Sequence, residues 1–312
     1  MSEYKRLLVN LARDEHRGEV LQKMQRLLTS ESEVELFSCV YHSQVESSHL
    51  FDSEGRQQAI QAVLRKVEKG LQCRVDKLEQ QGVRAGADVY WDRDQAEGIV
   101  RKVLRYQPDL VLHALDSHPR MLGPLLAAAD WRLLRQCPVP LLLGRTPRWP
   151  ERPRVAAAID PFHLDDRAAA LDRKILTHAD QLASQLGGEL HVVHVFNTLP
   201  HSAIFDEHLV VDYEQLQKKV KAEHRQRIGE MIAPWQLEVG DPCVHLLEGE
   251  FHQLIPRWVE DESIDVLVMG SLARGFVDRL LIGSSAERLL DQVNSDLLII
   301  KPDNFRCPVT EF

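Results

Sequence analysis

Asp265–Lys301 reads DVLVMGSLARGFVDRLLIGSSAERLLDQVNSDLLIIK, in which an apolar run, a glycine-containing stretch, a helical segment and a second apolar run follow one another. Short apolar strands that alternate with helices indicate a parallel sheet, because such strands are buried on both faces. Asp109–Arg145 has the same order and aligns with this stretch without a gap, at a constant shift of 156 residues. We therefore expect an α/β protein that contains a duplicated domain.

The two copies share identical residues as well as the same order of elements. The pairs that are identical in this register are Asp109/Asp265, Leu125/Leu281, Arg132/Arg288, Leu133/Leu289, Leu134/Leu290, Gln136/Gln292, Leu141/Leu297 and Leu142/Leu298. Most of the other pairs are apolar in both copies. Chance alone rarely produces an ungapped match of this length.

Apolar runs of strand length extend the repeat over the whole chain. In the first half they are Arg6–Leu11, Val34–Tyr41, Val83–Tyr90, Leu110–Ala114 and Val139–Leu143. In the second half they are Val155–Ile159, Leu190–Phe196, Val244–Leu247, Val266–Met269 and Leu297–Ile300. Helical segments separate the runs, so we expect two tandem doubly wound domains, each with a five-stranded parallel sheet.

The expected domain boundary is rich in proline. Pro147, Pro150 and Pro153 lie within eight residues of chain, and proline interrupts both helix and strand because it lacks a backbone donor. We expect an N-terminal domain at 1–146, a linker at 147–152 and a C-terminal domain at 153–312. A free edge strand invites pairing, so Val139–Leu143 and Leu297–Ile300 are expected to pair and to make an internal pseudo-dimer.

Composition limits the classes of function. The formal net charge is −9, with 38 basic and 47 acidic residues, which gives no sequence-wide attraction for nucleic acid. No window approaches the roughly 18 apolar residues of a membrane helix, and Met1–Leu8 lacks the apolar core of a signal peptide. We expect a cytoplasmic protein with neither direct nucleic-acid binding nor membrane insertion.

The five cysteines are odd in number and widely spaced, and no two form a CxxC pair. This spacing favours reduced, mostly buried thiols over a disulfide framework or a thiolate zinc site.

The segment that opens at Gly270 carries the strongest site signal. It follows an expected strand, contains Gly275 and Gly283, and ends in Ser284 and Ser285 at an expected helix start. Glycine lets the backbone approach a ligand closely, and free N–H groups at a helix N-terminus suit phosphate oxygens. The alternative is that Ser284 or Ser285 is simply a helix N-cap.

This spacing resembles the nucleotide-binding signature of the universal stress protein family: Gly, two residues, Gly, nine residues, Gly and then Ser or Thr. Gly270, Gly283 and Ser284 match it, whereas Ala273 stands where the middle glycine belongs. An extra methyl there would clash if the position needs positive φ or a close phosphate. Gly275 is near enough to restore the turn.

The resemblance extends to the other strands of the second half. Val155–Pro161 is similar to the family's first strand with its aspartate, His194–Phe196 to the second, and Leu247–Glu250 to the turn after the third. The residues implied to bind ligand are Asp160, Pro161, Val195, Glu248, Gly249, Gly270, Ala273, Arg274, Gly275, Gly283, Ser284 and Ser285. The implied ligand is ATP, ADP or AMP, with Mg²⁺ only alongside the nucleotide.

The first half lacks the corresponding residues. At the same shift Gly270, Ala273, Gly283 and Ser284 correspond to Ala114, Ser117, Ala127 and Ala128. With the ends of the two first strands aligned, Asp160 falls opposite Ala12. We interpret this half as a scaffold whose phosphate-binding turn is lost.

Several other features have simpler explanations. Asp160 before Pro161 would turn the chain even without a ligand. His191 and His194 are three apart in a strand, so they face opposite sides and share no metal site. His163, Asp165 and Asp166 suit a helix start better than a metal. Residues 197–213 form a long apolar connection, interpreted as either a lid over a pocket or an interdomain contact.

Three functions remain open at this point. The first is a stress-response protein whose ligand in the second domain controls its interaction with an unknown protein partner. The second is a slow ATPase at Gly270–Ser285, although the chain contains no familiar catalytic motif. The third is a scaffold without nucleotide, with an apolar or acyl ligand lined by Phe205, Leu209 and Val211. A homodimer is compatible with all three.

Overall fold

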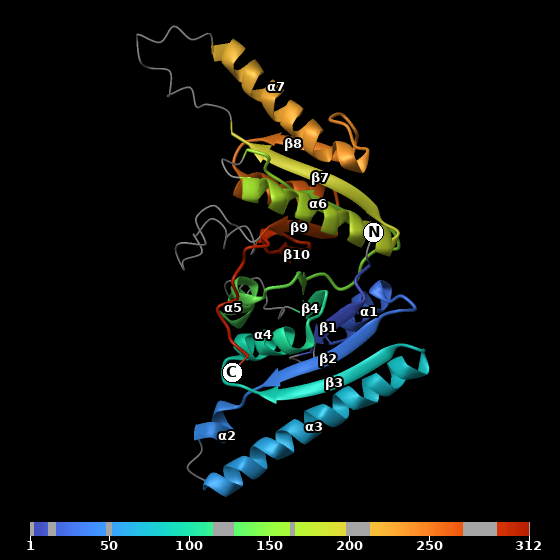
Figure 1. Cartoon of the computed structure of the whole chain (residues 1–312), viewed down its shortest axis with the longest axis vertical. Coiled ribbons are helices and arrows are strands. Elements are labelled where there is room, and N and C mark those ends of the chain that lie inside the picture. The colour runs from blue at the N-terminus through green and yellow to red at the C-terminus, as the bar shows by residue number, and fades with distance from the viewer. Residues whose placement is uncertain are drawn as a thin grey trace. The chain divides into compact units, whose positions relative to one another are not determined.

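The computed structural model describes residues 3–11, 17–47, 52–114, 128–162, 166–197, 213–270 and 292–311. The chain divides into two compact units (Figure 1). The first comprises Met1–Pro150 and Asp296–Phe312, and the second Glu151–Ser295.

The first unit is an α/β sheet with helices between its strands. Its strands are β1 (Arg6–Asn10), β2 (Glu33–Val40), β3 (Arg84–Trp91), β4 (Leu110–Ala114), β5 (Leu141–Gly144) and β10 (Asp296–Ile300). Its helices are α1 (Arg17–Leu27), α2 (Ser43–Ser47), α3 (Ser53–Gln80), α4 (Gln95–Tyr106) and α5 (Ala128–Gln136).

The strand order of this unit is β3-β2-β1-β4-β5-β10. β1 to β5 run parallel, and β10 pairs antiparallel with β5, with Leu298 opposite Leu142. The two apolar runs expected to pair therefore do so. The central strands are apolar along their length because both faces are covered, and Leu7, Leu8 and Val9 are fully buried.

The second unit repeats the alternation of parallel strands and helices, without an antiparallel strand among its described residues. Its strands are β6 (Arg154–Ala158), β7 (Glu189–Phe196), β8 (Val244–Glu248) and β9 (Val266–Gly270). Its helices are α6 (Asp166–Leu186), α7 (Tyr213–Ile232), a short 3-10 helix η2 (Ala233–Trp235) and α8 (Phe251–Asp261). The parallel order β9-β6-β7-β8 places β6 between its two neighbours, and α6 packs on β6, β7 and β9.

One pair of repeated aspartates performs the same task in both units. Asp109 accepts hydrogen bonds from the backbone N–H groups of Lys5 (3.0 Å) and Arg6 (2.8 Å). Asp265, its counterpart, accepts one from the N–H of Arg154 at 2.8 Å. Each carboxylate thus fixes the amino end of the first strand of its unit. The repeat found in the sequence is therefore also a repeat of contacts.

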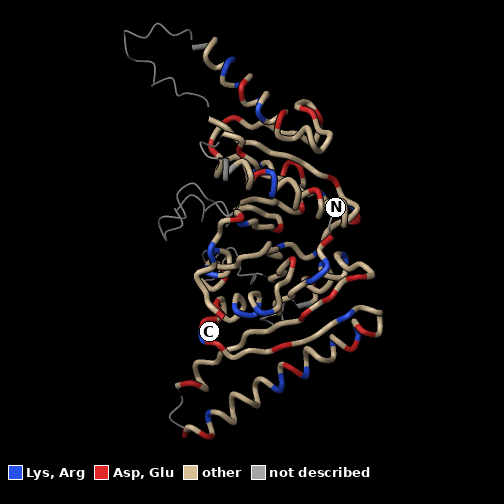
Figure 2. The backbone as a smooth tube through the Cα atoms, in the orientation of Figure 1, with Lys and Arg blue, Asp and Glu red and all other residues tan. Residues whose placement is uncertain are grey.

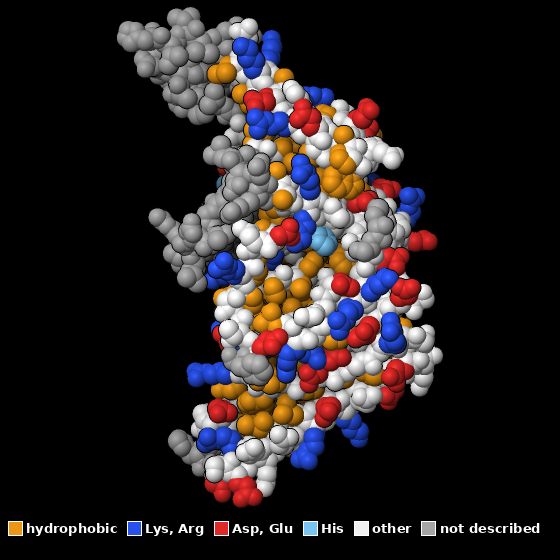
Figure 3. Space-filling model, in the orientation of Figure 1, with side chains coloured by type: hydrophobic (Ala, Val, Ile, Leu, Met, Phe, Trp, Pro, Cys, Tyr) orange, Lys and Arg blue, Asp and Glu red, His pale blue; other side chains and the backbone are white. Residues whose placement is uncertain are grey.

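The helices begin where the sequence supplies a cap. Asp52 accepts a hydrogen bond from Gly55 N–H at 2.7 Å before α3, and Asp94 accepts one from Glu97 N–H before α4. α3 runs along β3 (Figure 1), and Figure 2 shows both charge signs on it. On the face of the molecule that Figure 3 shows, acidic and basic side chains are interspersed and no continuous basic area is visible.

The observed strands begin and end within about two residues of the expected ones. The largest shift is in the last strand of the first half, expected from Val139, where β5 begins at Leu141. Pro140 explains this difference, because its carbonyl accepts from Val111 N–H at 3.0 Å but it has no N–H to donate.

The expectation that most cysteines are buried was wrong. All five are free, but only Cys39 and Cys137 are buried, while Cys73 is exposed on α3. Burial raises the pKa of each of the two buried thiols to about 12, so both stay protonated.

Candidate functional site

The carboxyl ends of β6 and β9 form the switch point of the second unit. The chain leaves β6 toward β7 on one side and returns to β9 on the other, and ligands of open parallel sheets bind at such a reversal. Asp160 and Pro161 follow β6, and Gly270 is the last residue of β9. Two of the sequence-predicted segments therefore meet at this point.

The remaining predicted residues divide into two groups. Val195 lies near the carboxyl end of β7, and Glu248 and Gly249 lie at the end of β8, so they belong to the same edge of the sheet. Ala273, Arg274, Gly275, Gly283, Ser284 and Ser285 lie outside the described residues. The apolar connection at 198–212, His163 and Asp165 also lie outside them.

Asp160 turns the chain, as the simpler interpretation predicted. Its carboxylate accepts a hydrogen bond from the N–H of Phe162 at 3.2 Å, and its own N–H donates to Asp172 on α6 at 3.3 Å. A carboxylate has room for about four hydrogen bonds. The turn itself uses only one of them.

Two of the predicted ligand-binding glycines lie among the described residues, and each has a structural reason to be glycine. Gly249 has φ 140°, a conformation that strongly favours glycine, and its N–H donates to the carbonyl of Phe196 at 2.9 Å. A Cβ at Gly270 would lie 2.9 Å from Leu171 Cδ2 and 3.3 Å from Ile175 Cδ1. Gly270 therefore lets α6 pack closely on the end of β9.

Glu248 is held by an ion pair with α7. Its carboxylate lies 2.6 Å from Lys221 Nζ, and both side chains are partly exposed. This contact fixes α7 beside the end of β8. Val195 is half-buried in the neighbouring strand, between His194 and Phe196.

A cluster of rings, which the sequence did not indicate as a unit, lies beside these residues. It consists of Phe162, His194, Phe196 and His224, and Arg227 lies over the Phe162 ring with its guanidinium carbon 4.3 Å from the centroid. The His224 centroid is 3.8 Å from that of Phe162 and 4.3 Å from that of Phe196. The rings join the end of β7, the turn after β6 and α7.

Hydrogen bonds fix the tautomers of the two imidazoles. His194 Nδ1 lies 3.0 Å from the carbonyl oxygen of Ile159, which only accepts, so His194 donates there. Its Nε2 then carries the lone pair and accepts from His224 Nδ1 at 2.8 Å. Both rings are therefore neutral Nδ1–H tautomers.

Burial keeps this pair neutral. It lowers the pKa of His194, opposed by the Ile159 carbonyl and by the Asp160 charge. It also lowers the pKa of His224, helped by His194 and opposed by Asp160. A neutral, aromatic wall at the end of β7 therefore stands beside the carboxylate of Asp160.

The other strand histidine confirms the expected opposite orientation. His191 stacks on His245 with centroids 5.7 Å apart, and His245 meets the edge of Trp258 on α8. His194 instead faces α7. Among the described residues no group of three or more metal-ligating side chains is close enough to hold an ion.

The switch point of the first unit has different residues. Asn10 Nδ2 lies 2.7 Å from His113 Nδ1, and His113 Nε2 lies 2.8 Å from Asp130 Oδ1. All three side chains are buried. Ala114 ends β4 and Ala128 begins α5, while Ala12, Ser117 and Ala127 lie outside the described residues. A row of three buried, hydrogen-bonded polar side chains thus occupies the carboxyl ends of β1 and β4.

Comparison with known proteins agrees with this architecture. Residues 155–301 match the Universal stress protein family. A protein of unknown function from Pseudomonas aeruginosa PAO1 has a similar structure, with a TM-score of 0.75, 24% identity, and coverage of 96% of this chain and 94% of that one. A universal stress protein from Archaeoglobus fulgidus gives a TM-score of 0.66 at 18% identity, over 97% and 98% of the chains.

Residues 155–301 therefore belong to the universal stress protein family, and the chain as a whole is similar to its tandem two-domain members. Within the family it is similar to universal stress protein E. It is 27% identical to that protein of Escherichia coli K12 over 73% of this chain and 72% of the relative. It is 24% identical to the universal stress protein E homolog of Haemophilus influenzae, over 96% and 98% of the two chains.

No helix among the described residues is long and apolar enough to cross a membrane.

Proposed function

We propose that the second unit binds an adenine nucleotide or a similar small ligand at the switch point between β6 and β9, and that occupancy controls binding to a protein partner during the stress response in the cytoplasm. The observation that carries the proposal is the strand order. It brings Asp160 together with Gly270, the first residue of the glycine motif.

The described residues suit the base and ribose end of such a ligand. Asp160 is a hydrogen-bond acceptor at the reversal point, and Val195 is half-buried at the same edge. Apolar and ring surfaces beside a few directed polar groups are typical of small-molecule sites. The phosphates, with Mg²⁺ where present, would meet Gly283, Ser284 and Ser285.

Binding, rather than catalysis, is the function that this edge supports better. The described residues here hold neutral imidazoles and a carboxylate, and none of them pairs a nucleophile with a base. Slow ATP hydrolysis and a nucleotide-free scaffold with an apolar or acyl ligand are the alternative functions.

Two measurements test the proposal. Mass spectrometry of ligand released from freshly purified protein should identify an adenine nucleotide. Calorimetric titration with ATP should then show binding that Asp160→Ala weakens at least about tenfold, because a lost hydrogen bond to a buried polar group costs about 1–3 kcal/mol. Asp261→Asn is the matched control, because this exposed carboxylate lies at the end of α8, toward the amino ends of the strands.

A released lipid-like species, or no heat with ATP at millimolar concentration, would favour the scaffold instead. Phosphate release that Asp160→Ala and Gly283→Ala both abolish would favour the ATPase.

A further inference from the structure

A pocket lies in the first unit, at the carboxyl ends of β2 and β3. Its volume is about 310 Å³, and it is lined by Tyr41, Glu46, Trp91, Asp92 and Arg93. This is near the lower end of the roughly 300–1,000 Å³ typical of small-molecule sites. The pocket therefore suits a small ligand.

Two aromatic rings form its apolar side. Tyr41 follows β2 and Trp91 ends β3, and their ring centroids are 5.7 Å apart at an interplanar angle of 57°. The ring centroids of His42 and Trp91 are 6.1 Å apart. Trp91 therefore has a ring neighbour at each of the two residues that follow β2. Both pocket rings are half-buried and keep exposed surface. Aromatic faces attract ammonium groups through the ring quadrupole.

The acidic groups nearest the β3 end are already neutralised. Asp92 accepts from Arg101 Nη1 at 2.6 Å and from the N–H of Asp94 at 2.9 Å. Asp94 in turn is paired with Arg132. These contacts belong to the start of α4, and they leave little net charge on Asp92.

Two charges of opposite sign on the pocket wall have no such partner. Glu46 comes from α2 and Arg93 from the turn before α4, and both are exposed. Within the described part of the chain neither side chain forms an ion pair or a side-chain hydrogen bond, with each other or with a third residue. The pocket thus offers an acceptor and a donor of full charge from two different elements.

We propose that this pocket binds a small zwitterion of the betaine and amino-acid class. The ligand's ammonium group lies against Trp91 and Tyr41 near the Glu46 carboxylate, and its carboxylate pairs with the Arg93 guanidinium. A cation alone would satisfy Glu46 and the rings but leave Arg93 unpaired, and an anion alone would do the reverse. This site is separate from the proposed nucleotide site in the second unit.

Glycine betaine and choline are matched probes, because both carry a trimethylammonium group and only glycine betaine carries a carboxylate. Calorimetric titration of the full chain should show that glycine betaine binds at least about tenfold more tightly than choline, since choline makes no charge-assisted contact to Arg93. Arg93→Gln should remove this difference by weakening glycine betaine alone. Arg306→Gln, at an exposed arginine elsewhere in this unit, should leave both affinities unchanged.

Trp91→Leu should weaken both probes, because it keeps an apolar side chain but removes the ring face. Equal affinities of the unsubstituted chain for the two probes would overturn the proposal, as would no binding of glycine betaine at tens of millimolar. Binding of glycine betaine that survives Arg93→Gln unchanged would also overturn it, and this surface variant keeps the test valid if Trp91→Leu fails to fold. ATP binding in the second unit is measured separately and does not depend on these outcomes.

Discussion

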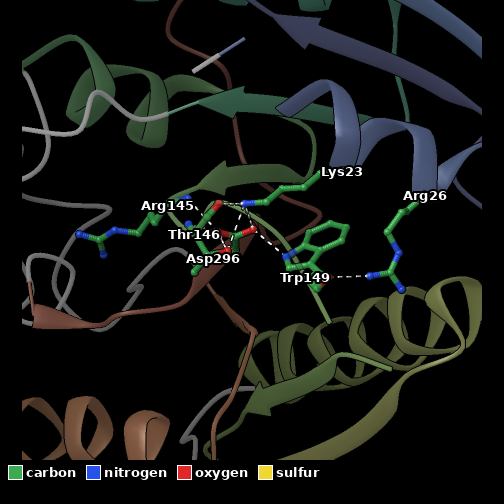
Figure 4. A network of polar contacts seen from close by, with 6 residues as sticks. All are labelled: Lys23, Arg26, Arg145, Thr146, Trp149 and Asp296. Atoms are coloured by element: carbon green, nitrogen blue, oxygen red, sulfur yellow. Dashed lines mark hydrogen bonds and ion pairs between the residues drawn. The ribbon is translucent and has the colours of Figure 1, made fainter. Parts of the chain in front are cut away.

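The ammonium group of Lys23 on α1 lies 2.5 Å from the carboxylate of Asp296 on β10, and their side chains are 3% and 0% exposed. Asp296 also accepts from the N–H groups of Arg145 (2.7 Å) and Thr146 (2.8 Å) and from Trp149 Nε1 (2.8 Å). Figure 4 shows these donors converging on the carboxylate, while the Arg145 side chain points away. The charge of Asp296 is therefore fully compensated within the first unit.

Asp296→Ala should destabilise the protein by about 3–5 kcal/mol, because it leaves the Lys23 charge buried without its partner. Urea unfolding monitored by circular dichroism measures the loss. The double variant Lys23→Met with Asp296→Leu should recover only part of it, since it removes both charges but leaves the N–H groups of Arg145, Thr146 and Trp149 without their acceptor. Glu311→Gln, at an exposed carboxylate near the same end of the chain, should change stability by less than about 0.5 kcal/mol. A single variant as mild as this control would contradict the expectation.

The strands could be predicted from the sequence because their signal is local. Each is a short apolar run, and the 156-residue repeat shows which runs correspond. The repeated contacts of Asp109 and Asp265 show that the repeat extends to the role of individual side chains. The pairing of β5 with β10 was also predictable, because both runs are apolar and end their halves, but its antiparallel direction was seen only in the structure.

The polar contacts around the sites could not be predicted in the same way. His194 and His224 are 30 residues apart, one in a strand and one in an amphipathic helix, and nothing local relates them. Asp296 is 147 residues from Trp149 and reads simply as the residue before a strand. The only available signal was a polar residue in or next to an apolar run, as with Asn10, His113 and His194. Such a residue indicates that a partner exists but does not identify it.

Gly249→Ala should destabilise the protein by about 1–2 kcal/mol, because alanine at φ 140° is strained and its Cβ would lie 3.1 Å from Leu254 Cδ1. Thermal unfolding measures the effect. Gly18→Ala is the control: Gly18 is in helix α1, a Cβ there would have no atom within 4 Å, and alanine should stabilise the protein by about 0.5–1 kcal/mol. Equal effects of the two substitutions would show that the turn after β8 is not strained.

His178 on α6 should make the protein less stable in acid. Burial lowers its pKa from 6.5 to about 4, helped by the charge of Lys174. The unfolded chain therefore binds this proton first, and stability falls as the pH decreases from about 6.5 to about 4. The loss from this group is at most about 3 kcal/mol. His178→Leu should flatten the profile of unfolding free energy against pH over that range, and parallel profiles of the two proteins would contradict this.

The His194–His224 pair should respond to acid in two distinct steps. The Nδ1–H of His224 donates to His194, so a proton added to His224 Nε2 leaves their hydrogen bond intact. A proton added to His194 Nε2 would set two donors against each other and break it. The Asp160 charge favours the first step, while the burial that lowers both pKa values delays it below the usual range near 6.5.

Nitrogen-15 spectra of the imidazole rings check this order directly. Above pH 7 both rings should show the Nδ1–H tautomer, and His224 should titrate at a higher pH than His194. Because both pKa values are lower than in the unfolded chain, the pair stabilises the fold fully above about pH 6.5, and this stability is lost as the pH falls. His224→Phe keeps the ring contacts with Phe162 and Phe196 and should reduce that acid-dependent loss. An Nε2–H tautomer for His194 would exclude its hydrogen bond to Ile159, and with it the neutral wall that stands beside Asp160.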